Sequence, residues 1–120
     1  MGRRGRRLAK LAAPVSDYSD GEGNVLTLRG SLSPGARREY AALRSSPAPR
    51  ASATLEDSWQ RALELLFELL AVRWVIAGAA IERQSELLTR FRAAGKQERT
   101  WVREKLREHC AEHFPDVQAP

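Results

Sequence analysis

The sequence predicts an all-α protein, a small antiparallel bundle of three main helices and one short N-terminal helix, with a disordered basic N-terminal tail. Three observations lead to this fold class. A length of 120 residues limits the chain to one small domain. Apolar residues recur at helical spacing through most of residues 51–115. Clusters of Ser, Gly, Pro and Asp, typical of loops and linkers, interrupt the first fifty residues.

The main unit, residues 51–115, is expected to contain three helices. The first begins at a capping-box pattern, Thr54 with Asp57 three residues later. Gly78, Gly95 and Pro115 mark the ends of the three helices. Short connectors imply that neighbouring helices run antiparallel. The predicted helices are residues 55–77, 80–94 and 96–113.

The first part of the chain is expected to be only partly ordered. Residues 24–30, NVLTLRG, are predicted to form a short extended segment that is too brief to found a sheet by itself. Ser33 as N-cap and Pro34 at the first helical position begin a short helix. The predicted organisation is a basic tail, a partly ordered segment, a bundle and a C-terminal tail, over residues 1–24, 25–50, 51–115 and 116–120.

The predicted helix 55–77 has more apolar surface than its neighbours can cover. Two adjacent apolar stripes leave it only a narrow polar face. Arg73 lies at the centre of the apolar arc, where a guanidinium must be paired with a carboxylate or reach solvent. We therefore expect a non-catalytic protein–protein interaction or regulatory module, a homodimer or one member of a complex. The expected interaction face consists of Trp59, Leu63, Leu66, Leu70, Arg73 and Trp74.

The charge distribution supports an alternative function. Residues 1–50 carry ten basic and four acidic side chains, whereas residues 51–120 carry ten and eleven. A segment with this excess would bind nucleic acid or another polyanion by counterion release, without sequence selectivity. The candidate polyanion contacts are Arg3, Arg4, Arg6, Arg7 and Lys10.

A third hypothesis is a metal site on the pair His109 and His113. Residues 109–113, HCAEH, resemble the H-x-x-E-H motif of the inverted zinc metalloproteases. That resemblance implies a third ligand well downstream of the motif, and only seven residues follow His113. We therefore expect no peptidase activity, and a histidine pair that faces the core or an interface.

Other classes are excluded by what the sequence lacks. There is no phosphate-binding loop, no paired-cysteine zinc site and no nucleophile with an identifiable base. We therefore expect no catalytic residue and no cofactor. Because the stretch from Leu65 to Ile81 contains Glu68 and Arg73, we expect no membrane span. The single cysteine, Cys110, and the absence of an export signal favour a reducing cytoplasm. The predominance of Arg among the basic residues and the abundance of Ala favour a bacterial source with GC-rich codons.

Overall fold

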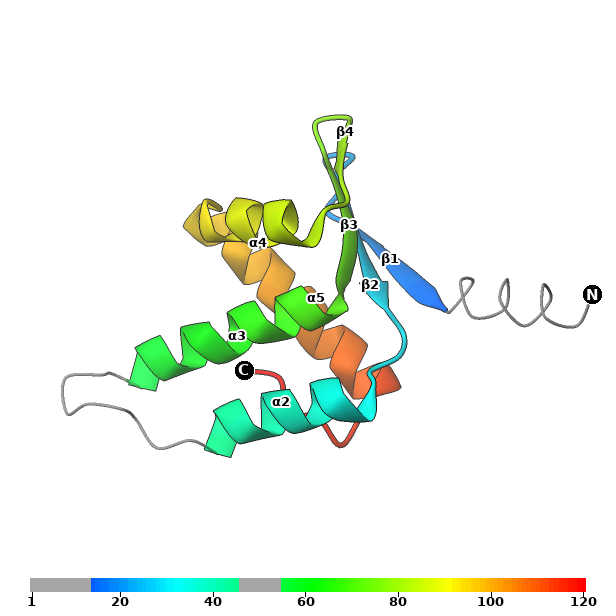
Figure 1. Ribbon diagram of the computed structural model, residues 1–120. Coiled ribbons are helices and arrows are strands. Elements are labelled where there is room, and N and C mark those ends of the chain that lie inside the picture. Colours follow the sequence, from blue (N-terminus) through cyan, green and yellow to red (C-terminus); the bar gives the residue numbers. More distant parts are fainter. Residues whose placement is uncertain (1–13, 46–54) are drawn as a thin grey trace, which may run out of the picture.

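The fold is α+β, a four-stranded antiparallel sheet with helices packed on it, so the prediction of an all-α helical bundle is wrong. The structure, a computed structural model, describes residues 14–45 and 55–120. The sheet has the strand order β1-β2-β3-β4, and all neighbouring strands are antiparallel (Figure 1). Along the described chain the elements are β1 (Val15–Ser19), β2 (Val25–Arg29), α2 (Pro34–Ser45), α3 (Leu55–Leu70), β3 (Ala71–Ile76), β4 (Ala79–Ile81), α4 (Gln84–Arg92) and α5 (Lys96–His113).

The first two strands form a hairpin around a glycine-containing turn. Gly21 and Gly23 have φ angles of 85° and 87°, a left-handed conformation that glycine adopts without steric cost. One oxygen of the Asp20 carboxylate accepts hydrogen bonds from the backbone N–H groups of Glu22 and Asn24, at 2.8 and 3.2 Å. β2 confirms the extended segment expected at residues 24–30. It forms a sheet because β1 and β3 supply partners on both of its sides.

The predicted helix 55–77 is the largest error, because the chain changes from helix to strand between Leu70 and Ala71. The residues after Leu70 are rich in β-branched and aromatic side chains, which favour a pleated, half-buried surface. Trp74 is 1% exposed, whereas the adjacent Arg73 is exposed. Arg73 and Trp74 thus face opposite sides of the sheet, as neighbours in a strand do. A shift in the β2–β3 register between Thr27 and Leu28 interrupts this alternation, so Ala71 is buried on the same side as Trp74.

Ala77 and Gly78 turn the chain back into β4, with φ angles of 52° and 82°. Two consecutive left-handed residues make the tight turn that suits a two-residue β-hairpin. The Asn24 side chain braces this turn by accepting a hydrogen bond of 2.9 Å from the Ala77 N–H. Gly78 is thus a hairpin residue and not a helix terminator. The expected second helix loses its first residues, 80–83, to β4 and the following connection.

Two other predicted helices are confirmed. α5 has the bounds expected for residues 96–113, and the chain leaves it through Phe114 and Pro115. α2 begins where Pro34 predicted, and the Ser33 hydroxyl accepts a hydrogen bond of 3.1 Å from the Ala36 N–H. This is the N-cap interaction expected from the sequence.

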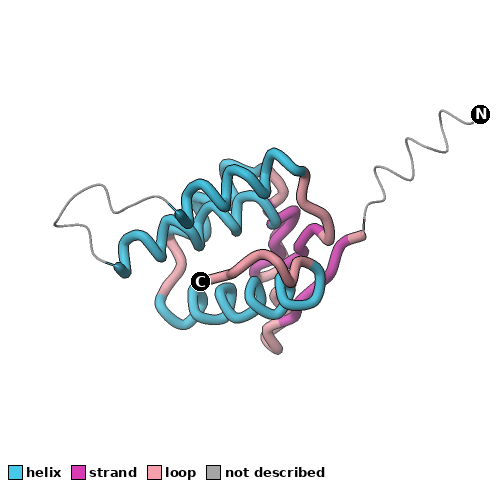
Figure 2. Tube along the Cα trace, turned by 90° about the horizontal axis from the view of Figure 1, so that it is seen from below, coloured by secondary structure: helices cyan, strands magenta, loops and turns pink. Residues whose placement is uncertain are grey.

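The helices lie on one side of the sheet, and the core fills the space between the two layers (Figures 1 and 2). Phe67 of α3 stacks on Phe91 of α4, with ring centroids 4.6 Å apart. Phe67 also meets Trp74 of β3 edge-on at 5.8 Å. The buried residues come from both halves of the chain, so residues 25–45 share one core with the later helices. The buried hydrophobic residues are Leu26, Leu28, Tyr40, Ala62, Leu63, Leu66, Phe67, Leu70, Ala71, Trp74, Leu87, Phe91, Ala94, Val102, Leu106, Cys110 and Phe114.

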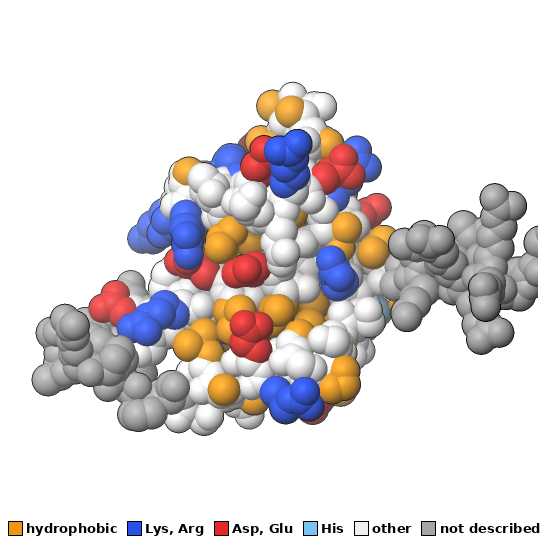
Figure 3. Space-filling model, viewed as in Figure 1, with side chains coloured by type: hydrophobic (Ala, Val, Ile, Leu, Met, Phe, Trp, Pro, Cys, Tyr) orange, Lys and Arg blue, Asp and Glu red, His pale blue; other side chains and the backbone are white. Residues whose placement is uncertain are grey.

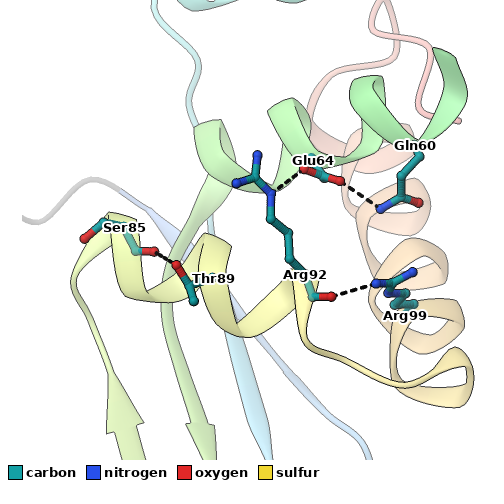
Figure 4. Close-up of polar contacts among 6 residues, drawn as sticks. All are labelled: Gln60, Glu64, Ser85, Thr89, Arg92 and Arg99. Carbon is teal, nitrogen blue, oxygen red and sulfur yellow. Dashed lines mark hydrogen bonds and ion pairs between the residues drawn. The ribbon is translucent and has the colours of Figure 1, made fainter. Parts of the chain in front are cut away.

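Polar contacts tie α3, α4 and α5 together at their outer edge (Figure 4). Arg92 Nε of α4 donates to Glu64 of α3 at 2.7 Å. The Arg92 carbonyl accepts from Arg99 of α5 at 2.6 Å. Gln60 Nε2 donates to the second oxygen of Glu64 at 3.2 Å. Because the Arg92 side chain is 61% exposed, we expect its ion pair to contribute no more than about 1 kcal/mol.

The C-terminal segment packs against α2 and α5 (Figure 2). The Tyr40 hydroxyl of α2 donates to the Gln118 carbonyl at 2.7 Å, and burial raises its pKa to about 12. Arg103 Nε of α5 donates to the Pro120 carbonyl at 3.2 Å. Residues 116–120, expected as a tail, therefore fix α2 relative to α5.

Candidate interaction site

The site centres on β1, which the side chain of His109 holds against α5. His109 is completely buried. Its Nε2 lies 2.7 Å from the carbonyl oxygen of Arg29, which can only accept a hydrogen bond. The proton is therefore on Nε2, and Nδ1 accepts from the Tyr18 hydroxyl at 2.8 Å. One imidazole thus connects α5 with both strands of the first hairpin.

His113 makes a second, weaker contact with the same strand. Its Nε2 lies 3.3 Å from the Ser16 hydroxyl, and its ring centroid is 4.5 Å from that of His109. The structure therefore places both histidines toward the core, as the helical spacing predicted. Both nitrogens of His109 are already used, and the described residues contain no group of three His, Cys, Asp or Glu side chains able to hold a metal ion. His109 and His113 hold β1 against α5 through Tyr18 and Ser16, and we call this pair of histidines the clamp.

Cys110, beside the clamp, is 1% exposed, and burial raises the pKa of its thiol to about 11. A nucleophilic cysteine needs an accessible thiolate near neutral pH. Cys110 is therefore a residue of the core.

The clamp predicts a pH-dependent stability. Burial is the main cause that lowers the pKa of His109 below its usual value of 6.5, and the neighbouring His113 adds to the effect. The native state then binds fewer protons than the unfolded state once the pH falls below about 6.5, so its free energy of unfolding decreases there. We expect urea midpoints to be level from pH 8 to about 7 and to decline below about 6.5.

His109→Gln is the control for this titration, because its side chain carries no charge at any of these pH values. The pKa values of Asp20 and Asp116 are also lowered, but from 3.8, so their loss of stabilisation belongs to more acidic conditions. The variant should therefore lose most of the decline between about pH 6.5 and 4.5. An equal decline in wild type and variant would show that another group causes it.

The outer edge of β1 carries a row of backbone groups that have no partner among the described residues. Hydrogen bonds join the Gly30 N–H to the Pro14 carbonyl and the Asp20 N–H to the Asn24 carbonyl, at the two ends of the hairpin. Between them the antiparallel register makes residues 16 and 18 the hydrogen-bonded positions. The N–H and C=O groups of Val15, Asp17 and Ser19 therefore point away from β2, and no described strand pairs with them.

Two of the usual protections of an edge strand, Pro and Lys, are absent from β1, while the charge of Asp17 and the length of five residues remain. Its five residues contain no Pro and no Lys, and β1 carries Val15, the only exposed large hydrophobic side chain in the described part of the chain. Pro14 does not block the edge, because residue 14 directs its backbone toward β2. The opposite edge is shorter, since β4 has three residues. β1 is thus the more complete template for an added strand.

The sheet face away from the helices is open and polar in its middle. The Thr27 hydroxyl donates to the Asp17 carboxylate at 2.6 Å across the hairpin, and Arg73 lies beside Thr27 on the next strand. Arg73 is exposed here and forms no ion pair with a described carboxylate, so it meets the second of the two expectations and reaches solvent. Arg29, beside Val15, is also exposed on this face.

An acidic hollow lies beside the turn between β1 and β2. The volume of this hollow is about 480 Å³. Glu22 is exposed and forms no ion pair among the described residues, whereas Glu98 pairs with Arg90 at 2.6 Å. The backbone N–H of Glu22 is the main cause that lowers the pKa of Asp20, so its carboxylate is charged. The lining residues are Asp20, Glu22, Asn24, Trp74, Gly95, Gln97, Glu98 and Trp101.

The interaction face predicted on helix 55–77 does not exist as a surface. Leu63, Leu66, Leu70 and Trp74 are buried in the core, because α3 packs on the sheet as well as on other helices. Trp59 is half-buried, and the guanidinium of Arg103 lies 3.7 Å above its ring centroid. The apolar surplus is therefore covered within the chain.

The predicted polyanion contacts, Arg3, Arg4, Arg6, Arg7 and Lys10, lie outside the described residues. On the described surface, basic and acidic side chains are interspersed on the face that Figure 3 shows. This face has no concentrated basic area of the kind typical of DNA-binding domains.

Sequence reasoning missed the β1 edge and the acidic hollow. The signal for the hairpin was two short segments, VSDYS and VLTLR, separated by residues 20–24, which contain two glycines.

No helix of the described part is long and apolar enough to cross a membrane. Comparison with protein-family models, with curated proteins and with solved structures gives no match to this chain.

Proposed function

We propose that this protein is a non-catalytic self-association module, in which β1 of one copy pairs with β1 of a second copy. The unpaired backbone row of Val15, Asp17 and Ser19 carries this proposal. Adding a strand to a free edge satisfies such groups and is a common mode of protein recognition. We retain the self-association expected from the sequence, but we place its surface on β1 of the sheet instead of on the predicted helix 55–77.

A second copy suits this edge because an antiparallel pair of identical strands has two-fold symmetry. If Asp17 faced Asp17 of the other copy, two like charges would be directly opposite, which is destabilising. A register with Ser16 at the axis avoids this and sets Val15 opposite Asp17. Each pair of Val15 and Asp17 then exchanges two backbone hydrogen bonds.

The same register brings opposite charges together on the open face. Arg29 is the neighbour of Val15 on β2, so it would lie two strand spacings, about 10 Å, from Asp17 of the second copy. An arginine side chain spans much of that distance. The symmetry repeats the contact, which favours two copies in this register over an unrelated strand.

The catalytic alternatives have less support. Both imidazole nitrogens of His109 hold β1, and the thiol of Cys110 is buried. These groups are the chemically reactive side chains that the sequence singled out, and each has a structural role. We therefore propose a binding role without catalysis.

Asp17→Pro in the full chain tests the proposal, with Asp17→Ala as its matched control. Both variants lose the carboxylate, but only proline loses the outward N–H, and an edge strand tolerates proline on its free side. By sedimentation over a concentration series, we expect wild type and Asp17→Ala to dimerise and Asp17→Pro to stay monomeric with an unchanged circular dichroism spectrum. A wild type that stays monomeric, or equal dimerisation of the two variants, would refute the proposal.

A second candidate function is polyanion binding by the basic segment, residues 3–10. Its support is the charge balance, because the chain carries a net charge of +5 while residues 51–120 carry one more acidic than basic side chain.

A further inference from the structure

We infer that a second hollow, between α2 and the C-terminal segment, binds a small organic anion, a carboxylate carried on an apolar body. We call it the basic hollow. Its volume is about 540 Å³, within the usual range for small-molecule sites. One face of α2 and residues 116–118 form its walls. No lining residue belongs to the sheet, so the inference is independent of the β1–β1 pairing.

Contacts between the two walls fix the shape of the basic hollow. The Tyr40 hydroxyl donates to the Gln118 carbonyl at 2.7 Å, and Arg37 forms an ion pair with Asp116. The Arg37 guanidinium also lies 5.4 Å from the centroid of the Phe114 ring. Because these contacts hold both walls in place, a ligand that binds between them orders few further groups.

Apolar side chains line the middle of the basic hollow. Ala41 is exposed, and its small side chain lies on α2 between the long side chains of Arg38 and Arg44, three residues from each. Val117 is half-buried on the opposite wall, and the buried Tyr40 lies beside it in the lining. An alkyl or aromatic body that replaces water over these side chains is bound favourably.

Two arginines supply the positive charge for the anion. Arg38 and Arg44 are exposed and form no ion pair with a described carboxylate, whereas Arg37 is already paired. Burial raises the pKa of Tyr40 and the charge of Arg44 opposes this rise, so the Arg44 guanidinium lies near the phenol. A base in the last turn also complements the helix dipole, but Arg38 in the middle of α2 has no such role. The two guanidinium groups can therefore donate to a carboxylate that lies over Ala41.

Sodium octanoate is the probe for this inference, because it carries a carboxylate on an alkyl chain. In a titration of the isotope-labelled full chain, we expect saturable changes in the amide NMR signals, largest on α2 and residues 116–118. Sodium acetate has the same head group without the alkyl chain. It should bind roughly tenfold more weakly or less, since it gains little from the apolar lining.

Arg38→Gln and Arg44→Gln should each weaken octanoate binding by roughly twofold to fivefold, as expected for contacts of exposed charges. Arg83→Gln is the matched control, since Arg83 is exposed, forms no ion pair among the described residues and precedes α4. It should leave the affinity unchanged. Ala41→Trp fills the basic hollow from an exposed helical position and should abolish binding.

Several results would overturn the inference. Equal affinity for acetate and octanoate would show that charge alone is recognised. Equal octanoate affinity in the three Arg→Gln variants would show that Arg38 and Arg44 take no part. Binding that persists in Ala41→Trp would place octanoate elsewhere on the protein, and a titration without saturable changes on α2 would exclude the site. None of these results depends on whether the protein dimerises.

Discussion

Replacing Trp74 with alanine is expected to lower the free energy of unfolding by about 3 to 5 kcal/mol. Trp74 is 1% exposed and lies between Leu26 and Ile81 on the neighbouring strands. Its ring packs edge-on against Phe67, and the guanidinium of Arg90 lies 5.3 Å from its centroid. The truncation removes the contacts that join the sheet to α3 and α4.

Arg73→Ala is the control for this prediction, because Arg73 is the preceding residue on the opposite face of β3. We expect a change of no more than about 0.5 kcal/mol, as for other exposed positions. On a continuous helix, Arg73 and Trp74 would share one apolar arc, and both truncations would lower the free energy of unfolding. Comparable losses in urea denaturation would therefore contradict the strand.

Replacing His109 with alanine is expected to cost about 3 kcal/mol. The truncation leaves the Tyr18 hydroxyl and the Arg29 carbonyl without their hydrogen-bond partner, at about 1 to 3 kcal/mol where they are buried. It also opens a cavity beside the Phe114 ring, whose centroid is 5.8 Å from that of His109. Denaturation should be followed at pH 8, where the imidazole is neutral in both states.

A double-mutant cycle with Tyr18→Phe isolates the hydrogen bond from the packing. Tyr18→Phe alone should cost about 1 kcal/mol, and it should cost much less once His109 is alanine. His113→Ala should lose less than about 1 kcal/mol, because its contact with Ser16 is long and its ring is partly exposed. Strict additivity of Tyr18→Phe and His109→Ala would show that the two side chains do not interact.

The helices at both ends of the fold could be predicted because local signals define them. Ser33 and Pro34 begin α2 through capping, and Gly95 and Pro115 lie just outside α5. The segment after Leu70 could not be predicted in the same way. A mostly apolar run satisfies both helical and strand spacing, and the sheet partners β2 and β4 decide between them.

The candidate site was harder to predict than the helices, because it is made of contacts between residues far apart in the sequence. The spacing of His109 and His113 predicted that they share one face, and they do. Nothing in the local sequence connects them with Tyr18 or Ser16. The apolar excess of residues 55–77 was real, but it is buried between α3, β3 and the neighbouring helices, so it gave the wrong location for an interaction surface.

The clamp between Tyr18 and His109 also bears on how the chain folds. The two residues are 91 positions apart, so a contact at the first strand closes only when the last helix is in place. Closing such a long loop costs conformational entropy before any contact compensates for it, and it slows folding. The contact between Tyr18 and His109 is therefore expected to form late in folding, after the local hairpin of β1 and β2. In a newly made chain, β1 lacks the support of His109 until α5 has been synthesised, so the β1–β1 pairing that we propose would come after that point.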